Sequence, residues 1–509
     1  MTSPPPGGPS WLEEPAPRAG EGDRSSWLEE PVRETGEGDR PAWLRPPAPP
    51  PAPRRGRRVG GLTAVLVLLL VAGLAAGGLV FATRREPPAG TAAGTAPGTP
   101  ASPAPATPTT RAPAATPAGP GVLAVERDVA ELRELRFRRR VPVTVESPAK
   151  LARRLVATLA AETDEGELRR QGRAMELLGE LPAGTDLPRL LNRVQAESVL
   201  GFYVPGRQPP KGRLYVRSNR GLDPYAKIIL AHELTHAVTD QRFDLTRADR
   251  LAAGTGNEDA LAAYSALVEG DATLLMQRYL AERLTPAEQA DAGLVAATQR
   301  TPQRDAAPAV IRESLLFPYS EGLRFVRTLY ARGGWDAVNA AYLDPPASTE
   351  QLLHPERYLG DRDRPQRVEV ADLSGRLGPG WRPAAEVSFG ELDARLLLEG
   401  ELAVTAAEAA AAGWDGGRLR TFQRGASTAL ALRTVWDSGA EATQFCDAMR
   451  GWAGARFGAA ARAPGSLRWS GAGQRTALVC RGRGVAWLSA PDRPTLDRLQ
   501  AAAGPAGSR

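Results

Sequence analysis

PYAKIILAHELTHAVTDQRF, residues 224–243, is a predicted helix that carries two of the three histidines of the chain. Asp223 and Pro224 are typical of a helix N-cap and first turn. His232 and His236 are four residues apart, so both imidazoles lie on one face of the helix and can bind one metal ion. Glu233 lies beside them and can take a proton from a water that the metal polarises. This HExxH pattern predicts a zinc site with Glu233 as the general base.

A catalytic zinc needs a third protein ligand and an open position for water or substrate. The only other histidine is His354, so the third ligand is either that residue or a carboxylate. Glu269 is the better candidate, because it interrupts an apolar run, LVEGDA, in the next predicted helix, which starts near Asn257. A carboxylate on a packed face is costly unless it is paired or binds a metal, although a solvent-facing helix residue is the alternative. We therefore expect His232, His236 and Glu269 to bind zinc.

Other polar residues near these positions have supporting roles. Asp240, one turn beyond His236, either orients an imidazole or caps a loop. Asp271 is two residues from Glu269 and cannot share its helix face, so it is at most a supporting or structural partner. The segment PPASTEQLLHPERY at 345–358 contains a capping signal and a short helix that Pro355 stops.

His354 lies at the end of that short helix. A lone histidine is usually a satisfied polar residue, but two of the three in this chain already have a predicted role. We expect His354 to donate to the oxyanion of a tetrahedral intermediate, and Glu350, one turn earlier, to hold its ring.

The surrounding sequence predicts an α+β fold. VLGFYVP at 199–205 and GRLYVRSN at 212–219 read as a hairpin, because β-branched and aromatic residues flank a loop with Gly and Pro. A mainly helical domain is expected over 122–385. A smaller α+β domain is expected over 386–509, where GWD at 413–415 and VWD at 435–437 are predicted core and turn residues. The sequence does not choose whether the second domain grips substrate, packs on the cleft or binds the cell envelope.

The first 121 residues have a different composition. WLEEPAPRAGEGDR at 11–24 recurs as WLEEPVRETGEGDR at 27–40, within a predicted disordered cytoplasmic tail over 1–58. This tail either docks a cytoplasmic partner or is an unconstrained duplication. Residues 59–82 contain 24 uncharged, mostly apolar residues with more Arg before than after them. They predict one transmembrane helix with the N-terminus in the cytoplasm. A Pro, Ala and Thr-rich linker is expected over 83–121.

The overall composition excludes several classes of protein. Two Cys in 509 residues exclude a disulfide-dense scaffold, and 53 Gly exclude collagen. The net charge of +6 comes from 64 basic and 58 acidic residues spread along the chain, so we expect no nucleic-acid partner. Cys446 and Cys480 both follow the predicted span, in an oxidising compartment that permits a disulfide, with two free buried thiols as the alternative.

Two resemblances add to this reading. AHELTHAVTD at 231–240 resembles the active-site helix of the thermolysin family of zinc endopeptidases, where two His bind zinc and the Glu is the general base. GFYVP, HELTHAVTDQRFDL, ALVEGDAT, PASTEQLLHPERY and AAAGWDGGR resemble uncharacterised bacterial membrane-anchored or exported proteins of the gluzincin type. The second resemblance covers about 122–500 and implies a zincin-like fold with Glu269 as the third ligand. It also implies that RLYVRSN at 213–219 is the edge strand beside the cleft, where an extended peptide can add.

Together these features predict a zinc-dependent metallopeptidase of the cell membrane, with its catalytic domain outside the cytoplasm and a peptide or protein as substrate. Two alternatives remain open. One is a catalytically inactive zincin-fold binding or scaffold protein of the cell envelope, and the other is a zinc amidase that acts on the cell wall.

Overall fold

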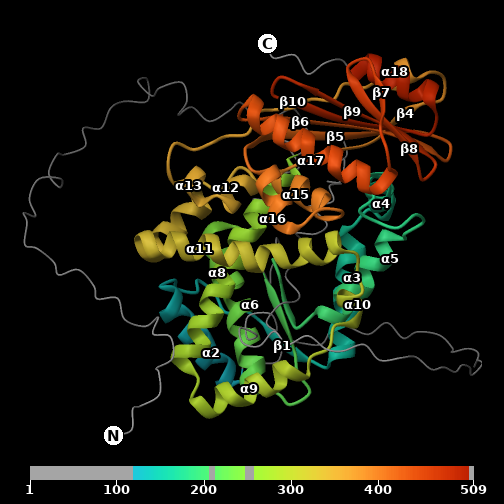
Figure 1. The fold of residues 1–509 in the computed structure, drawn as a ribbon. Helices are drawn as coiled ribbons and strands as arrows, with labels where there is room; N and C mark the ends of the chain where they lie inside the picture. Colours follow the sequence, from blue (N-terminus) through green and yellow to red (C-terminus); the bar gives the residue numbers. More distant parts are fainter. Residues whose placement is uncertain (1–118, 206–211, 247–256, 504–509) are drawn as a thin grey trace, which may run out of the picture. The chain divides into compact units, whose positions relative to one another are not determined.

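The computed structural model describes residues 119–205, 212–246 and 257–503. Helices and two β-sheets make up these ranges (Figure 1), so the predicted α+β class is confirmed. The predictions for the tail, for the span at 59–82 and for the linker up to residue 118 lie outside the described residues.

The N-terminal part of the described chain is mainly helical. Its elements are α2 (Pro120–Arg133), β1 (Val143–Glu146), α3 (Pro148–Glu162), α4 (Glu165–Leu178), α5 (Leu187–Ser198), β2 (Gly201–Val204), β3 (Arg213–Arg217), α6 (Pro224–Phe243), α8 (Glu258–Arg283), α9 (Pro286–Thr298), α10 (Pro302–Asp305), α11 (Ala309–Leu343), α12 (Thr349–Leu353) and α13 (Pro355–Leu359).

The C-terminal part combines strands and helices. Its elements are α14 (Ser374–Leu377), β4 (Arg382–Ser388), α15 (Glu391–Glu399), α16 (Val404–Ala411), β5 (Trp414–Arg424), β6 (Ser427–Trp436), α17 (Gly439–Phe457), β7 (Ala461–Ala463), β8 (Ser466–Gly471), β9 (Gln474–Arg481), β10 (Gly484–Ala490) and α18 (Arg493–Ala503).

The two helices that carry the predicted zinc ligands begin where the sequence predicts. The Asp223 side chain accepts a hydrogen bond from the backbone N–H of Ala226 at 2.8 Å, and Pro224 opens α6. The Asn257 side chain caps α8 in the same way, through the N–H of Ala260 at 3.1 Å. Most residues of both helices are buried, because α6 and α8 are apolar on nearly every face and lie in the centre of one hydrophobic core.

The small sheet has the strand order β1-β3-β2. The predicted hairpin is confirmed, because β2 and β3 are antiparallel with Gly201 opposite Val216. The expectation that RLYVRSN is an edge strand is wrong, since β1 pairs in parallel along the other side of β3, with Val143 opposite Leu214. The edge strand on the hairpin side is therefore β2.

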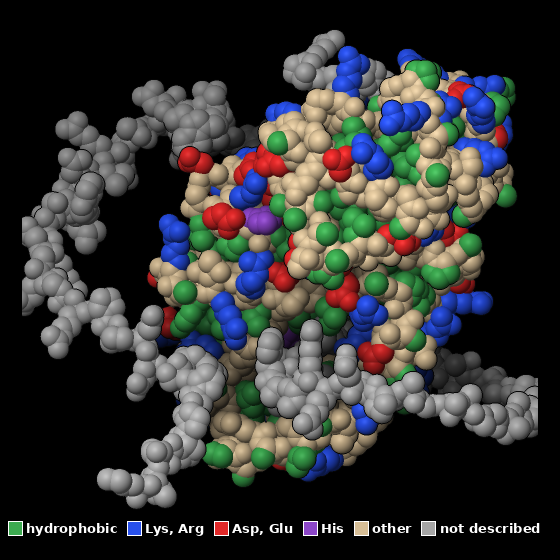
Figure 2. Space-filling view, in the orientation of Figure 1, with side chains coloured by type: hydrophobic (Ala, Val, Ile, Leu, Met, Phe, Trp, Pro, Cys, Tyr) green, Lys and Arg blue, Asp and Glu red, His purple; other side chains and the backbone are tan. Residues whose placement is uncertain are grey.

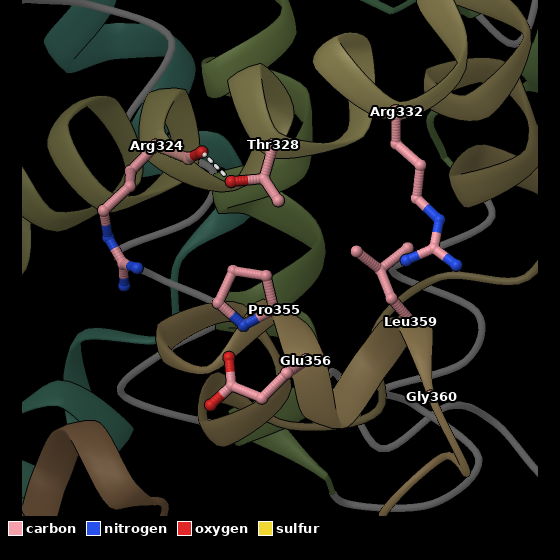
Figure 3. A pocket seen from close by; sticks show the side chains of 7 residues that line it. All are labelled: Arg324, Thr328, Arg332, Pro355, Glu356, Leu359 and Gly360. Carbon is pink, nitrogen blue, oxygen red and sulfur yellow. Dashed lines mark hydrogen bonds between the residues drawn. The ribbon is translucent and has the colours of Figure 1, made fainter.

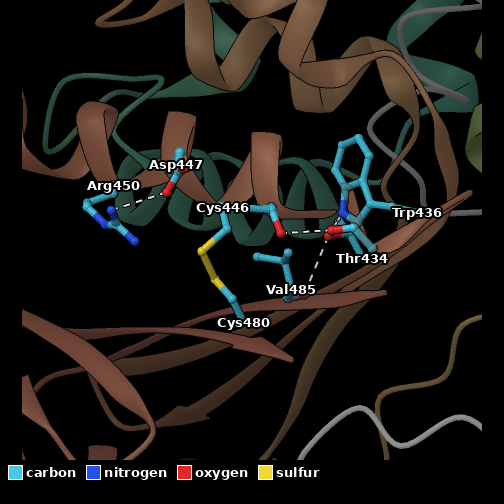
Figure 4. The surroundings of a disulfide bond; sticks show 9 residues. Thr434, Trp436, Cys446, Asp447, Arg450, Cys480 and Val485 are labelled. Carbon is cyan, nitrogen blue, oxygen red and sulfur yellow. Dashed lines mark hydrogen bonds and ion pairs between the residues drawn. A yellow bond between two sulfur atoms is a disulfide. The ribbon is translucent and has the colours of Figure 1, made fainter. Parts of the chain in front are cut away.

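The C-terminal sheet has seven antiparallel strands in the order β4-β5-β6-β10-β9-β8-β7. Helix α17 packs on one face through Phe445 and Trp452, and α18 packs on the other (Figure 1). Trp414 and Trp436 are buried in the core, as predicted. The disulfide between Cys446 of α17 and Cys480 of β9 joins helix and sheet (Figure 4), which excludes two free thiols.

The transmembrane prediction requires a correction. In the ranges that the structure describes, no helix is long and apolar enough to cross a membrane. The longest of these helices carry charged side chains along their length, such as Glu233 in α6 and Glu269 and Asp271 in α8. The predicted span at 59–82 lies outside these ranges, so none of the described helices takes that role, and the transmembrane assignment is not carried forward.

Charged side chains of both signs are interspersed on the face that Figure 2 shows. Lys and Arg alternate with Asp and Glu over the helical part and over the C-terminal sheet. Many arginines in the described part of the chain form ion pairs with nearby acids, for example Arg395 with Glu399 at 2.6 Å and Arg468 with Asp497 at 2.6 Å.

A buried ion pair joins α2 to the helix that carries Glu269. Arg133 Nε donates to Asp271 Oδ1 at 2.8 Å, Nη2 donates to Oδ2 at 3.1 Å, and both side chains are fully buried. The Tyr342 hydroxyl also donates to Asp271, at 2.8 Å, and the guanidinium lies over the ring of Trp335. Asp271 was predicted to be at most a supporting or a structural partner, and the structure shows the structural role.

Breaking this pair is expected to be strongly destabilising. Arg133→Met leaves the buried Asp271 charge without its partner, so the free energy of unfolding should fall by about 3–5 kcal/mol. The double variant Arg133→Met/Asp271→Leu removes both charges and should recover much of that loss. Urea unfolding followed by tryptophan fluorescence measures both effects. A double variant no more stable than Arg133→Met would contradict this account of the pair.

Candidate zinc site

Helices α6 and α8 bring the three predicted ligands together, although 37 residues separate the first from the last. His232 Nε2 lies 3.1 Å from Glu269 Oε2 and 3.1 Å from His236 Nε2, and His236 Nε2 lies 3.4 Å from Glu269 Oε2. The three side chains are buried, with exposed fractions of 7%, 2% and 2%. One atom from each side chain thus forms a corner of a small, almost equilateral triangle.

This triangle fits a zinc ion. Two ligand atoms at the usual Zn–N and Zn–O distances, about 2.0–2.1 Å, are about 3.3 Å apart in a tetrahedral site. The three observed edges lie within about 0.2 Å of that value. Each of these three atoms can accept a hydrogen bond, and all three face one another. Hydrogen bonds among them do not explain this arrangement well, whereas a shared metal ion does. His232, His236 and Glu269 would therefore form three corners of a tetrahedron and leave the fourth for water or substrate.

The electrostatics of the site favour the metal-binding protonation states. Burial lowers the pKa of His232, which keeps its imidazole neutral. Burial alone would raise the pKa of Glu269, but His236 and His232 outweigh it and bring this pKa down to about 2. Neutral imidazole and ionised carboxylate are the forms that coordinate metals.

Glu233 is buried beside the triangle, with an exposed fraction of 2%. Its carboxylate accepts a backbone hydrogen bond from Tyr203, whereas Oε2 has no hydrogen-bond partner among the described residues. Burial and the negative charge of Glu269 raise its pKa well above the usual value. One oxygen of this carboxylate is thus held in place, and the other remains available to take a proton.

Strand β2 presents its outer edge to Glu233. The N–H of Arg217 donates to the carbonyl of Leu200 at 2.8 Å, so the backbone groups of the next residue, Gly201, and of Tyr203 point away from β3. Gly201 allows β2 to lie close to α6, because a Cβ at this position would lie 2.9 Å from Ile229 Cγ2 and 3.1 Å from Glu233 Cγ. The edge strand next to the predicted general base is therefore β2, rather than β3.

Two glycines allow α8 and α11 to cross with their backbones in contact. A Cβ on Gly270 would lie 2.1 Å from the carbonyl oxygen of Gly322, and a Cβ on Gly322 would lie 2.0 Å from the carbonyl oxygen of Ala266. Gly270 directly follows the ligand Glu269. The crossing therefore sets how closely α11 approaches the three ligands.

Helix α11 contributes a residue that the sequence analysis missed. The ring of Tyr319 stacks on that of His232, with centroids 6.1 Å apart and an interplanar angle of 23°. Tyr319 is buried, and Gly322 lies three residues further along α11. Pro318 inside a helical, apolar pattern is the signal that could have identified this position, because an internal proline is costly and needs a reason.

Asp240 caps a loop. Its Oδ1 accepts the backbone N–H of Leu245 at 3.0 Å, and its Oδ2 accepts the hydroxyl of Tyr203 at 2.7 Å. Of the two predicted roles, the structure therefore shows the loop cap. The bond to Tyr203 also ties the end of α6 to β2.

His354 does not belong to the cluster of three ligands. Its Nε2 lies 2.8 Å from Glu391 Oε1, and this hydrogen bond raises the pKa of His354. Glu350 contacts Arg357 at 3.0 Å and does not hold the histidine ring. His354 lies between two short helices, α12 and α13, and its ring is held by Glu391 of α15. The oxyanion role of His354 stays a prediction, whereas the expectation that Glu350 holds its ring is wrong.

A surface pocket of about 510 Å³ lies between α11 and α13 (Figure 3). Its lining consists of Arg324, Thr328, Arg332, Pro355, Glu356, Leu359 and Gly360. None of the predicted zinc ligands lines it, so this pocket is separate from the candidate zinc site.

The C-terminal region holds the first turn of α8. Glu258 Oε2 accepts the backbone N–H of Ser388 at 2.8 Å, and the N–H of Asp259 donates to Ser388 Oγ at 2.9 Å. Asp259 also accepts two hydrogen bonds from Thr349, at 2.6 and 3.1 Å. Gly390 packs against this carboxylate, because a Cβ there would lie 1.8 Å from Asp259 Oδ1. The helix that carries Glu269 is thus fixed at its start by residues of β4, α12 and the start of α15.

The contacts at the start of α8 predict that the stability of the protein depends on pH. Burial raises the pKa of Asp259 to about 7 and that of Asp393 to about 6. The folded chain therefore holds protons that the unfolded chain has released above pH 4, so stability should fall as the pH rises from about 4 to about 7. Asp259→Asn should make this decline shallower, whereas Asp447→Asn, on the exposed side of α17, should not. Melting temperatures between pH 4 and 8 provide the test, and an equal decline in all three proteins would contradict it.

Comparison with known proteins finds a matching family for the C-terminal region only. Residues 380–500 match a family described as a domain of unknown function, DUF8575. This region contains the seven-stranded sheet and α17, and it excludes the two helices of the candidate zinc site. No curated protein and no solved structure matches the chain.

Proposed function

We propose that this protein is a zinc-dependent metallopeptidase with a zincin-like fold. The observation that carries the proposal is the triangle of His232 Nε2, His236 Nε2 and Glu269 Oε2, with edges of 3.1–3.4 Å. An HExxH helix, a glutamate on the following long helix and a strand edge beside Glu233 support the fold assignment. The zinc ligands would be His232, His236 and Glu269.

A zinc ion in this position would supply a Lewis acid that polarises the substrate carbonyl and lowers the pKa of the attacking water. Glu233 takes the proton from that water and passes it to the departing amine. The backbone N–H of Tyr203 holds the Glu233 carboxylate in the required orientation. Tyr319 positions the His232 imidazole by stacking on it.

The outer edge of β2 is the proposed binding edge for the substrate backbone. The outward-pointing backbone groups of Gly201 can pair with an extended peptide, which would then pass next to Glu233. This assignment moves the binding edge from β3 to β2, because β3 is covered on both sides by β1 and β2.

The disulfide supports a location outside the reducing cytoplasm. Cys446 and Cys480 are bonded, and such bonds persist mainly in oxidising compartments. An extracytoplasmic protein or peptide is therefore the proposed substrate class.

Substrate screening tests the proposed reaction. The full-length protein with zinc is incubated with a peptide library and, separately, with purified peptidoglycan fragments, and the products are identified by mass spectrometry. We expect new termini at peptide bonds of the library. Cleavage of cell-wall amides alone would instead favour the amidase. Bound zinc without turnover of either substrate would favour the scaffold protein.

A further inference from the structure

Three arginines from separate segments of the chain lie together at one end of the C-terminal sheet. Arg424 ends β5, Arg475 is the second residue of β9, and Arg493 begins α18. In the strand order β5-β6-β10-β9, Arg424 and Arg475 are three strand spacings apart, which is about 14 Å. Arg493 follows the end of β10, which lies between them. These three residues, the basic row, therefore cross the ends of four neighbouring strands.

The basic row lies on the face of the sheet that α18 covers. Phe422 and Ala490 belong to the apolar cluster beneath α18. Arg475 is opposite Ala490 in the pairing of β9 with β10, so both are on this face. Arg424 follows Phe422 by two residues, and side chains alternate along a strand, so Arg424 is on this face as well. The β5–β6 and β8–β9 hairpins have turns of only two residues, which leave the row uncovered by long turns of their own.

The side chains of the basic row lack close acidic partners. All three residues are exposed, and the side chain of Arg493 is 79% exposed. Among the described residues, no acid lies within salt-bridge distance of Arg424 or Arg475. Arg493 Nε is 4.0 Å from Asp497, whose carboxylate already pairs with Arg468 at 2.6 Å. Many other arginines of the chain are paired closely, so the positive charge of this row is unusually free for a partner.

Acidic residues are scarce around the basic row. Four segments form this end of the sheet, namely 380–383, 422–429, 471–476 and 488–496. Together they contain four arginines, which are the basic row and Arg382, and a single acid, Asp492, so the excess is three positive charges. Asp492 caps α18, because its Oδ1 accepts the backbone N–H of Thr495 at 2.7 Å. The end of the sheet is therefore suited to an anionic partner.

The aromatic residues at this end of the sheet face inward. Trp381 and Phe422 are buried, with exposed fractions of 6% and 0%. The guanidinium of Arg424 lies over the Trp381 ring, 4.9 Å from its centroid, so the arginine covers the ring and keeps its own charge outside. Proteins that bind single-stranded nucleic acid stack the bases on exposed rings. Guanidinium groups are thus what this surface offers to a partner.

We propose that the basic row binds a linear polymer of phosphate groups outside the cytoplasm. One phosphate cannot contact arginines about 14 Å apart, whereas a chain that crosses the strand ends can contact all three. The planar guanidinium fork matches phosphate oxygens bidentately. The disulfide between Cys446 and Cys480 is part of this same region and persists mainly in oxidising compartments, which favours a phosphate polymer of the cell envelope over a nucleic acid.

Such binding would give the C-terminal region a role of its own. The whole basic row lies within residues 380–500, which match DUF8575. The region would hold the protein on the envelope, and the candidate zinc site would not take part in this contact. This inference does not depend on the proposed peptidase activity.

The test is the binding of the full-length protein to fluorescently labelled poly(glycerol phosphate), followed by anisotropy at increasing NaCl concentration. Three phosphate contacts predict that the logarithm of the binding constant falls with the logarithm of the salt concentration with a slope of about −2. Arg475→Gln should weaken binding about fivefold and make the slope shallower by about 0.7. Arg424→Gln/Arg475→Gln/Arg493→Gln should lose nearly all binding. Glycerol phosphate itself should bind at least about 10²-fold more weakly than the polymer.

A matched control changes the same charge elsewhere. Arg153, Arg193 and Arg300 are exposed residues of the helical part, and the triple change of these arginines to Gln should leave binding as in wild type. The melting temperature of each variant shows whether it folds, and Arg475→Gln alone tests the row if the triple variant of the row does not. Peptide hydrolysis should be unchanged in the row variants, so that failure of this proposal and failure of the proposed function are distinguishable.

Several results would overturn the proposal. They are binding that does not depend on salt, equal losses of binding in the row variant and the control variant, and tighter binding to polyglutamate. Tighter binding to single-stranded DNA with the same number of phosphates, or to vesicles of anionic lipid, would likewise assign the row to a different partner.

Discussion

Glu233→Gln is expected to abolish peptide hydrolysis and to leave zinc binding intact. An amide cannot take a proton from the attacking water, and the loss of a general base typically lowers the rate by about 10²–10⁴-fold. The amide oxygen can still accept the backbone N–H of Tyr203, and Glu233 is not part of the ligand triangle. The variant also removes a buried acid beside Glu269, so the free energy of unfolding should not fall. Hydrolysis rate, zinc content and melting temperature are measured on the same preparation.

Two control variants are needed to interpret this result. His236→Ala should lose both zinc and hydrolysis, because it removes a corner of the triangle. Glu282→Gln makes the same chemical change on the surface of α8, where Glu282 pairs with Arg278, and should retain both. Hydrolysis by purified Glu233→Gln at close to the wild-type rate would contradict the proposed mechanism.

Gly270→Ala is expected to damage the site without touching any ligand. Its Cβ would lie 2.1 Å from the carbonyl oxygen of Gly322, so α8 and α11 must move apart. Overpacking of this kind costs about 1–3 kcal/mol of stability. The shift acts next to Glu269 and near Tyr319, and a displacement of about 1 Å can lower turnover about 10²-fold. We expect a lower melting temperature, faster loss of zinc to a chelator and reduced hydrolysis.

The chain offers a matched control for this substitution. Gly454 lies inside α17, and a Cβ there would meet no atom within 4 Å. Gly454→Ala should therefore be neutral or slightly stabilising, because alanine is the better helix former. Gly322→Ala should reproduce the defects of Gly270→Ala, since its Cβ would lie 2.0 Å from the carbonyl oxygen of Ala266. A Gly270→Ala protein as stable and active as Gly454→Ala would show that the helix crossing does not control the site.

Features that depend on local pattern were predictable from the sequence. Asp223 and Asn257 mark the starts of α6 and α8, because capping residues act within one helical turn. The spacing of His232 and His236 places both on one helix face for the same reason. Glu269 could be identified because an acid in an apolar helix needs a partner, and the structure places it at the two histidines.

Features that depend on distant pairing were not predictable. The position of β3 in the centre of its sheet depends on β1, a strand of four residues that lies about 70 residues earlier in the chain. The partner of His354 is Glu391, which belongs to α15 and is 37 residues away. Tyr319 reaches His232 only because Gly270 and Gly322 allow α8 and α11 to touch. None of these pairings leaves a periodic signal in the sequence.

The central claim is that His232, His236 and Glu269 hold a zinc ion, and metal analysis of the purified full-length protein tests it most directly. Zinc is measured in wild type and Glu269→Ala side by side after exposure to equal zinc and removal of the unbound metal. We predict about one zinc ion per chain in wild type and little or none in Glu269→Ala. Wild type without zinc, or a Glu269→Ala protein that binds zinc as tightly as wild type, would contradict the ligand set on which the proposed function rests.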